Sequence, residues 1–138
     1  MIKSQFPTKT AIVVERNLLP WQELNVTAFL ASAIAFRFPE TMGPEFNDAS
    51  NVNYLAIFRQ PVLIFQAKQN DLKKVYRKAR ENNLFVGIYT RPIFQTQGED
   101  NIKAIAAIKE EEQDLVGVVL YGETDLVNQC TNGISLHK

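Results

Sequence analysis

The side chains best suited to binding chemistry follow the ends of two apolar runs. Residues 10–14 (TAIVV) are followed by Glu15 and further polar residues, and residues 84–89 (LFVGIY) lead into a polar loop. Ligands of α/β proteins collect beyond the carboxyl ends of parallel strands. We therefore expect a small or nucleotide-like ligand at this edge, and no cofactor. The predicted ligand-binding residues are Arg16, Asn17, Asn25, Gln95 and Thr96.

Several of these residues also have a purely structural interpretation. Asn25 can act as a surface or capping amide of a helix, and Thr96 as a turn residue that bonds its own backbone. Trp21 and Tyr54 would form a flat apolar wall for a ligand if they are exposed near this edge, and would otherwise belong to the core. Both interpretations are open until the side chains are placed.

Nucleophilic and metal chemistry have little support in the sequence. The single histidine, His137, stands next to the C-terminus, where chains tend to fray. The single cysteine, Cys130, lies on the apolar side of an expected helix and reads as a buried, inert thiol. One histidine and one cysteine leave only carboxylates as metal ligands, so we expect no metal site. No glycine-rich phosphate loop follows the first apolar run.

Composition describes an ordinary soluble domain. The chain has 138 residues, 46% of them hydrophobic and 22% charged, which predicts one domain over residues 1–138. The formal net charge is zero, so binding to nucleic acid is not supported by charge, and no membrane partner is expected. The polar start, residues 1–10, does not resemble a secretory signal, and a lone cysteine agrees with a cytoplasmic location.

The elements that must position the site alternate between strands and helices. Residues 10–14, 84–89 and 115–121 are apolar without alternation, which predicts central strands buried on both faces. Pro20 suits the first turn of a helix that continues to about residue 36. Apolar spacing predicts a second helix over 72–79, capped by Asp71. Two shorter helices are expected over 101–109 and 124–130, the last ending near Gly133.

Two segments are harder to assign. Residues 37–52 have the composition of a long surface loop, and residues 54–65 form either a hairpin or a strand kinked at Pro61. The alternation of strands and helices predicts a three-layer α/β/α sandwich with a mixed, mostly parallel sheet of four or five strands.

Charge is unevenly distributed along the chain. Residues 59–91 carry eight basic and two acidic side chains, whereas residues 99–125 carry eight acidic and two basic ones. Because symmetric pairs are the commonest assembly, these opposite surfaces predict a homodimer that they hold together. The alternative is that both are ordinary solvated surfaces.

Several short motifs resemble one superfamily. Residues 122–136 resemble the closing helix and tail of the type II peptidyl-tRNA hydrolases, and residues 68–89 resemble their central helix and following strand. Thr96 and Gln97 stand where that family has a Thr-Gln pair. Residues 13–35 look more like a bacterial family of unassigned function in the same superfamily. The resemblance implies a peptidyl-tRNA hydrolase II-like fold and points, like the charge pattern, to a homodimer.

The departures from the hydrolase pattern concern its functional positions. The hydrolases have a lysine, a glutamine and an aspartate where this chain has Asn25, Phe29 and Pro92. An amide, a phenyl ring and a proline do not replace groups that orient water and stabilise an oxyanion. We therefore expect ligand binding without hydrolysis. The alternatives are a hydrolase of peptidyl-tRNA or a related ester, and a non-catalytic interaction protein.

Overall fold

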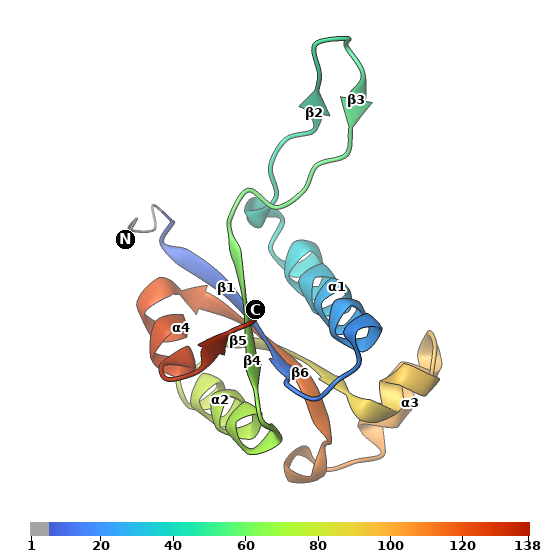
Figure 1. Cartoon of the computed structure of the whole chain (residues 1–138), viewed down its shortest axis with the longest axis vertical. Helices are drawn as coiled ribbons and strands as arrows, with labels where there is room; N and C mark the ends of the chain where they lie inside the picture. The colour runs from blue at the N-terminus through green and yellow to red at the C-terminus, as the bar shows by residue number, and fades with distance from the viewer. Residues whose placement is uncertain (1–5) are drawn as a thin grey trace.

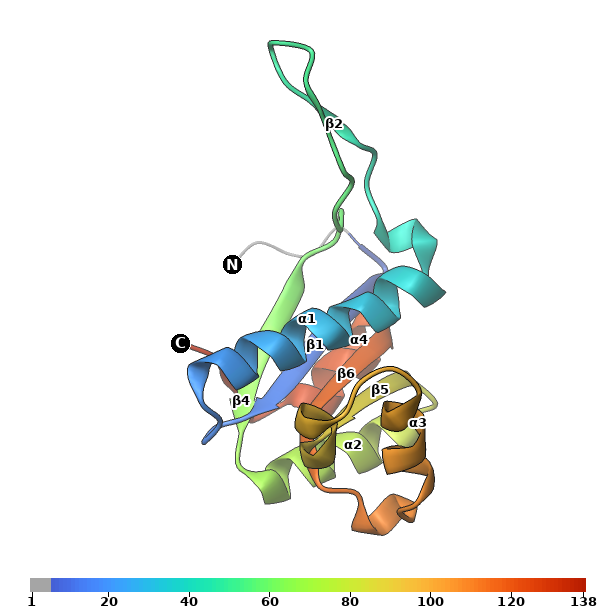
Figure 2. The same ribbon diagram turned by 90° about the vertical axis from the view of Figure 1, so that its right-hand side faces the viewer.

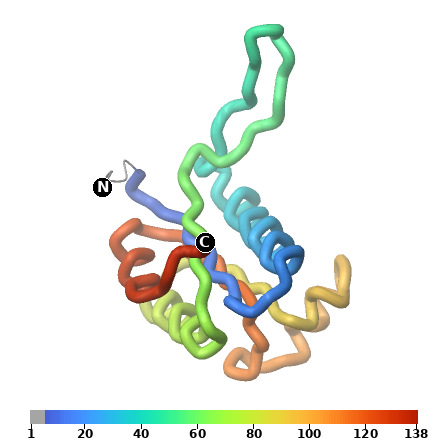
Figure 3. The backbone as a smooth tube through the Cα atoms, viewed as in Figure 1, coloured from blue at the N-terminus to red at the C-terminus, as the bar shows by residue number. Residues whose placement is uncertain are grey.

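A five-stranded sheet forms the centre of the molecule in the computed structural model, which describes residues 6–138; part of the polar start considered above lies outside this range. The strand order is β5-β6-β1-β4-β7, and Figures 1 and 3 trace the chain through it. The strands are β1 (Thr8–Glu15), β4 (Val62–Ala67), β5 (Phe85–Thr90), β6 (Leu115–Glu123) and β7 (Ser135–Leu136).

The sheet is mixed, but the expectation of a mostly parallel sheet is wrong. Only β1 and β4 pair in parallel, whereas β6 runs antiparallel to both β1 and β5, and β7 runs antiparallel to β4. The reason is that β6 and β7 return against their neighbours instead of crossing over to a parallel position. β1, β4 and β5 nevertheless run in one direction, so their carboxyl ends share one edge of the sheet.

Helices cover both faces of the sheet, as expected for three layers (Figure 2). α1 (Pro20–Arg37) packs on one face, against β1, β5 and β6. α2 (Gln69–Glu81) and α4 (Thr124–Thr131) pack on the other face and against each other. α3 (Glu99–Ala106) lies beside η2 (Arg91–Gln95), which directly follows β5. The remaining short helices are η1 (Pro39–Thr41) and η3 (Glu110–Glu112).

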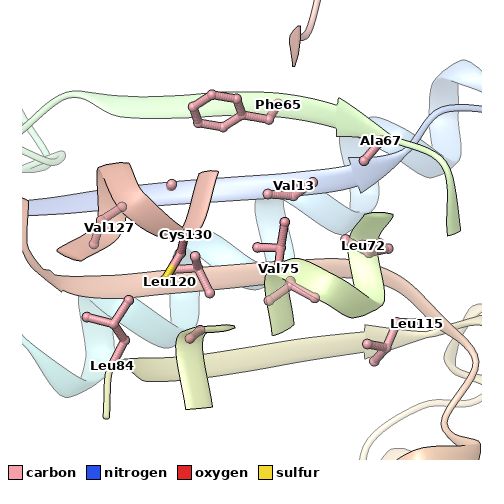
Figure 4. Packing of buried hydrophobic residues seen from close by; sticks show 13 residues of the cluster. Val13, Phe65, Ala67, Leu72, Val75, Leu84, Leu115, Leu120, Val127 and Cys130 are labelled. Carbon is pink, nitrogen blue, oxygen red and sulfur yellow. The ribbon is translucent and has the colours of Figure 1, made fainter. Parts of the chain in front are cut away.

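Two apolar layers flank the central strands. Ile12 and Val119 are buried, which confirms the prediction that β1 and β6 are central. On the α2 and α4 face, Leu72, Val75 and Val127 pack against the sheet (Figure 4). On the α1 face, a close approach requires Gly117, because a Cβ there would lie 2.3 Å from Val26 Cγ1.

The prediction that residues 84–89 form a central strand is wrong, because β5 is an edge strand. Its run is apolar since α1 and α2 cover its two faces. Phe85 remains exposed and makes an edge-on contact with Phe38, with 4.7 Å between the ring centroids.

The start of α1 and the end of α4 follow the sequence signals, whereas the helix expected over 101–109 is α3, which begins at Glu99 and already ends at Ala106. α1 begins at Pro20, and Gly133 follows α4 with φ of 84°. Asp71 does not cap α2, because the helix begins earlier and Lys68 occupies the N-cap position. Asp71 instead lies in the first turn, 4.0 Å from Lys74.

A hairpin arm, residues 43–57, projects from the body beyond the C-terminal end of α1 (Figure 1). Its strands are β2 (Phe46–Asn47) and β3 (Asn53–Tyr54), which pair antiparallel. Residues 54–65 are therefore neither a hairpin of their own nor one kinked strand. Tyr54 pairs back with Phe46, and β4 begins only at Val62. The expected loop at 37–52 supplies η1 and the first side of this arm.

Candidate functional site

An ion-pair clamp occupies the edge where β1 and β5 end. Arg91 Nη2 donates to both carboxylate oxygens of Glu15, at 2.8 and 2.9 Å. Arg91 Nε donates to Asp114 Oδ2 at 2.9 Å. Burial works against the charged guanidinium, but its hydrogen bonds to the Glu15 and Asp114 carboxylates and their negative charges outweigh burial and raise the pKa of Arg91 above its ordinary value. We call Glu15, Arg91 and Asp114 the clamp. It joins the ends of three strands.

An aromatic cluster lies beside the clamp, between α1 and η2. It consists of Trp21, Phe29, Tyr89 and Phe94. Tyr89 is buried and its ring contacts Phe29 and Phe94, with centroid distances of 5.7 and 5.0 Å. Trp21 contacts Phe94 edge-on at 5.7 Å. Trp21 and Phe29 are about half-exposed, so one side of the cluster is open to solvent.

Asn25 supplies the polar group of this cluster. Its Nδ2 donates to the Tyr89 hydroxyl over a long distance of 3.4 Å, and it is partly buried. Within residues 6–138 the side-chain oxygen of Asn25, Oδ1, has no hydrogen-bond partner. Burial raises the pKa of Tyr89, while the bond from Asn25 opposes that shift, so the hydroxyl stays protonated at neutral pH. The pair offers a ligand the partly exposed Asn25 amide, held from behind by a buried phenol.

The other predicted site residues lie on the surrounding loops. Arg16 and Asn17 are exposed between β1 and α1, and their side chains make no hydrogen bond or ion pair with the rest of the described chain. Gln95 is exposed at the end of η2. Thr96 Oγ1 bonds to Asn101 Oδ1, and weakly to the Ile93 carbonyl oxygen at 3.4 Å, so it fastens η2 to α3. Of the predicted set, only Asn25 reaches the aromatic cluster.

Comparison with known proteins places this chain in a family. A family model described as a protein of unknown function (DUF2000) matches residues 8–138. The chain belongs to the DUF2000 family. It is also similar to the solved structure of Atu0240, a protein of unknown function from Agrobacterium tumefaciens strain C58, with 28% identity and a TM-score of 0.93. That match covers 97% of this chain and 100% of the other. No curated protein matches the sequence.

The DUF2000 chain holds its two oppositely charged segments together internally. Tyr76 donates to Glu110 Oε2 at 2.7 Å, and Arg80 Nε donates to the Tyr76 hydroxyl at 3.1 Å. These residues line a groove of about 230 Å³ between α2 and η3, with Lys73 and Arg77 on one wall. The basic and acidic segments therefore meet within one chain, which reduces the charge left to join two chains.

The histidine and the cysteine of the DUF2000 chain lie outside the cluster. His137 Nε2 is 3.1 Å from Glu23 Oε2, and the His137 amide donates to the Ile64 carbonyl oxygen, so this end is tied to the sheet. Cys130 is buried, and burial raises the pKa of its thiol. Within residues 6–138 no group of three or more histidine, cysteine or carboxylate side chains could hold a metal ion. No helix in that range has the length and apolar character to cross a membrane.

Sequence reasoning placed Glu15 at this edge but missed the other residues that organise the site. Arg91 and Glu15 are 76 positions apart, and no local pattern connects them. The only signal was an acidic residue at the end of a buried strand. Tyr89 and Phe94 were missed because an aromatic residue in an apolar strand or loop has the sequence signature of core. Their role depends on the approach of Asn25 from another element.

Proposed function

We propose that this DUF2000 protein binds a small ligand with a flat aromatic ring, of nucleotide-like chemistry, and does not hydrolyse it. The observation that supports this proposal is the Asn25–Tyr89 pair inside a half-open aromatic cluster. A base-like ring stacks on Trp21 or Phe29, an interaction worth about 1–3 kcal/mol per base in other proteins. The Asn25 amide hydrogen-bonds to the edge of the ring, as asparagine does with adenine.

The loop before α1 supplies a charge that suits such a ligand. Arg16 is exposed and has no partner within residues 6–138. It lies five positions before Trp21 in the sequence, on the loop that leads into the helix carrying Trp21 and Asn25. A guanidinium in this position pairs with a phosphate or carboxylate of the ligand. The aromatic ring would then sit on the cluster and the anionic group on the loop.

The same site argues against ester hydrolysis. The resemblance to type II peptidyl-tRNA hydrolases would place lysine and glutamine at Asn25 and Phe29, and both positions contact Tyr89. The third position is Pro92, in η2. We propose that this chain is a single domain of hydrolase II-like architecture. Its ligand site lies where the hydrolases have their active site, but it lacks their reactive side chains. The buried Cys130 suits a reducing compartment, which we propose is the cytoplasm.

Tryptophan fluorescence tests the binding proposal directly, because Trp21 is the only tryptophan. We expect AMP or UMP to quench it with a saturable isotherm and to raise the melting temperature. Asn25→Ala is expected to weaken the affinity about tenfold, which corresponds to about 1.4 kcal/mol. The control Phe85→Leu changes an exposed aromatic residue outside the cluster and leaves the affinity unchanged. Absence of saturable quenching by either nucleotide at about millimolar concentration contradicts the proposal.

Turnover assays address the hydrolase alternative. We expect no cleavage of peptidyl-tRNA beyond the rate without protein. Turnover on the order of 1 per second, abolished by Asn25→Ala, would identify a hydrolase and refute binding without catalysis.

A further inference from the structure

The outer side of α1 lacks the polar surface of a solvated helix. Residues 24–36 contain no charged side chain. Leu24, Ala28, Ser32 and Phe36 follow one another at intervals of four and are all exposed. Leu24 is 71% exposed and Phe36 is 90% exposed. We call these four residues the outer row. An exposed apolar patch of this kind, without charged side chains, typically marks an interaction surface.

The hairpin arm is a second exposed surface with large apolar side chains. Residues 44–55 are all exposed, including Phe46, Tyr54 and Leu55, the last to 81%. An isolated two-stranded hairpin is at best marginally stable in water. The tip is nevertheless well defined, because Asp48 Oδ1 accepts bonds from the Ser50 and Val52 amides and Tyr54 donates to Asp48 Oδ2 at 2.8 Å. The arm is ordered and holds large apolar side chains among polar ones in solvent, and a second surface packed against it would cover them.

We propose that the outer row and the arm form the interface of a two-fold dimer, in which a second copy of this chain packs its α1 antiparallel to the first. An i, i+4 row packs against a like row with axes about 8–10 Å apart when the central residues are small. Antiparallel pairing sets Ala28 of one copy against Ser32 of the other. It also sets Leu24 against Phe36.

The arrangement of α1 and the arm favours the antiparallel form. The arm rises from the C-terminal end of α1, past the body of its own chain (Figure 2). In an antiparallel pair, each arm therefore projects past the N-terminal end of the partner's α1. A parallel pair would place the two arms beside each other and leave the bodies without a contact from them.

The available surface is sufficient for a stable pair. Seven large apolar side chains lie exposed on the outer row and the arm: Leu24, Phe36, Phe46, Val52, Tyr54, Leu55 and Ile57. At on the order of 100 Å² each, they offer about 700 Å² per copy before the smaller residues are added. A standard interface buries about 800 Å² per partner. A second copy of the chain would therefore cover the exposed apolar side chains of both the outer row and the arm.

Sedimentation of the full chain tests the interface. We expect twice the 15.7 kDa chain mass, unchanged between about 0.05 and 0.5 M salt because the contact is apolar. Leu24→Glu and Phe36→Glu are each expected to weaken the dimer at least tenfold, as at an interface hot spot. Both side chains are exposed, so circular dichroism should show an intact fold. The control, Lys73→Glu with Arg77→Glu, places new carboxylates on the opposite face and leaves the mass unchanged.

Cysteine crosslinking tests the orientation, because the natural Cys130 is buried. Ala28→Cys and Ser32→Cys proteins are mixed and oxidised. The antiparallel pair predicts a disulfide between the two different variants, whereas a parallel pair predicts disulfides within each variant and overturns the proposal. A monomeric wild-type protein at tens of micromolar, or a dimer dissociated only by the control substitutions on α2, also overturns it.

Discussion

Replacing Arg91 by methionine removes the cation of the clamp and keeps most of the apolar stem. The Glu15 side chain is only 11% exposed and has no bond partner except Arg91 within residues 6–138, so its carboxylate is left unpaired. A bond to a charged group contributes about 1.5–3 kcal/mol, and breaking a fully buried pair costs about 3–5 kcal/mol. Because Arg91 is 45% exposed and water screens it, we expect a loss of about 2 kcal/mol.

Urea denaturation at neutral pH measures this loss. We expect the midpoint to fall while the m-value stays constant, and the melting temperature to drop by roughly 8 °C for a chain of this size. Adding Glu15→Gln to Arg91→Met removes the unpaired charge and should recover about half of the loss. The control Lys74→Met removes an exposed contact of 4.0 Å to Asp71 and should cost less than about 0.5 kcal/mol. A cost for Arg91→Met no greater than the control would refute the reasoning.

Four further substitutions probe the core. Gly117→Ala should lower the free energy of unfolding by about 2–3 kcal/mol, because the new Cβ meets the rigid Val26 side chain. Gly122→Ala should lower it less, because the new Cβ meets the movable end of Leu84. Urea denaturation of both variants measures the two losses. Thr90→Val should be neutral or stabilising by about 1 kcal/mol in the same assay, because the buried Thr90 hydroxyl has no partner within residues 6–138. Since burial raises the pKa of Cys130, the folded state binds the thiol proton more tightly, and stability should decline as pH rises above about 8.5. A Cys130→Ala variant should show a smaller decline in melting temperature over that range.

The sequence was sufficient to predict which segments are buried and which are helical. Runs without polar alternation identified β1 and β6 as buried strands, and apolar spacing identified α2. It was not sufficient for strand direction, because an apolar run reads the same in a parallel or an antiparallel sheet. β5 was misplaced at the centre for a related reason, since helices pack on both faces of this edge strand and its residues are mostly apolar, although Phe85 remains exposed.

Contacts between distant segments account for what was missed at the site. Asn25 and Tyr89 are 64 positions apart, and Glu15 and Arg91 are 76 apart. The hairpin arm was missed because β2 and β3 pair over only two residues each, which is too short for a periodic signal. In each case the local sequence shows which chemical groups are present, but it does not show which distant residue they contact in the folded chain.

The clamp and the aromatic cluster are coupled through η2. Arg91 opens this short helix, and its backbone amide donates to the Asp114 carbonyl oxygen at 3.0 Å. Phe94, one turn later, packs on both Trp21 and Tyr89. Loosening Arg91 should therefore displace Phe94 and alter the cluster without touching Asn25. If the cluster binds the ligand, Arg91→Met should weaken quenching of Trp21 by AMP even where the protein is fully folded, and Lys74→Met should not. An affinity unchanged by Arg91→Met would show that the ion pair stabilises the sheet edge without positioning the site.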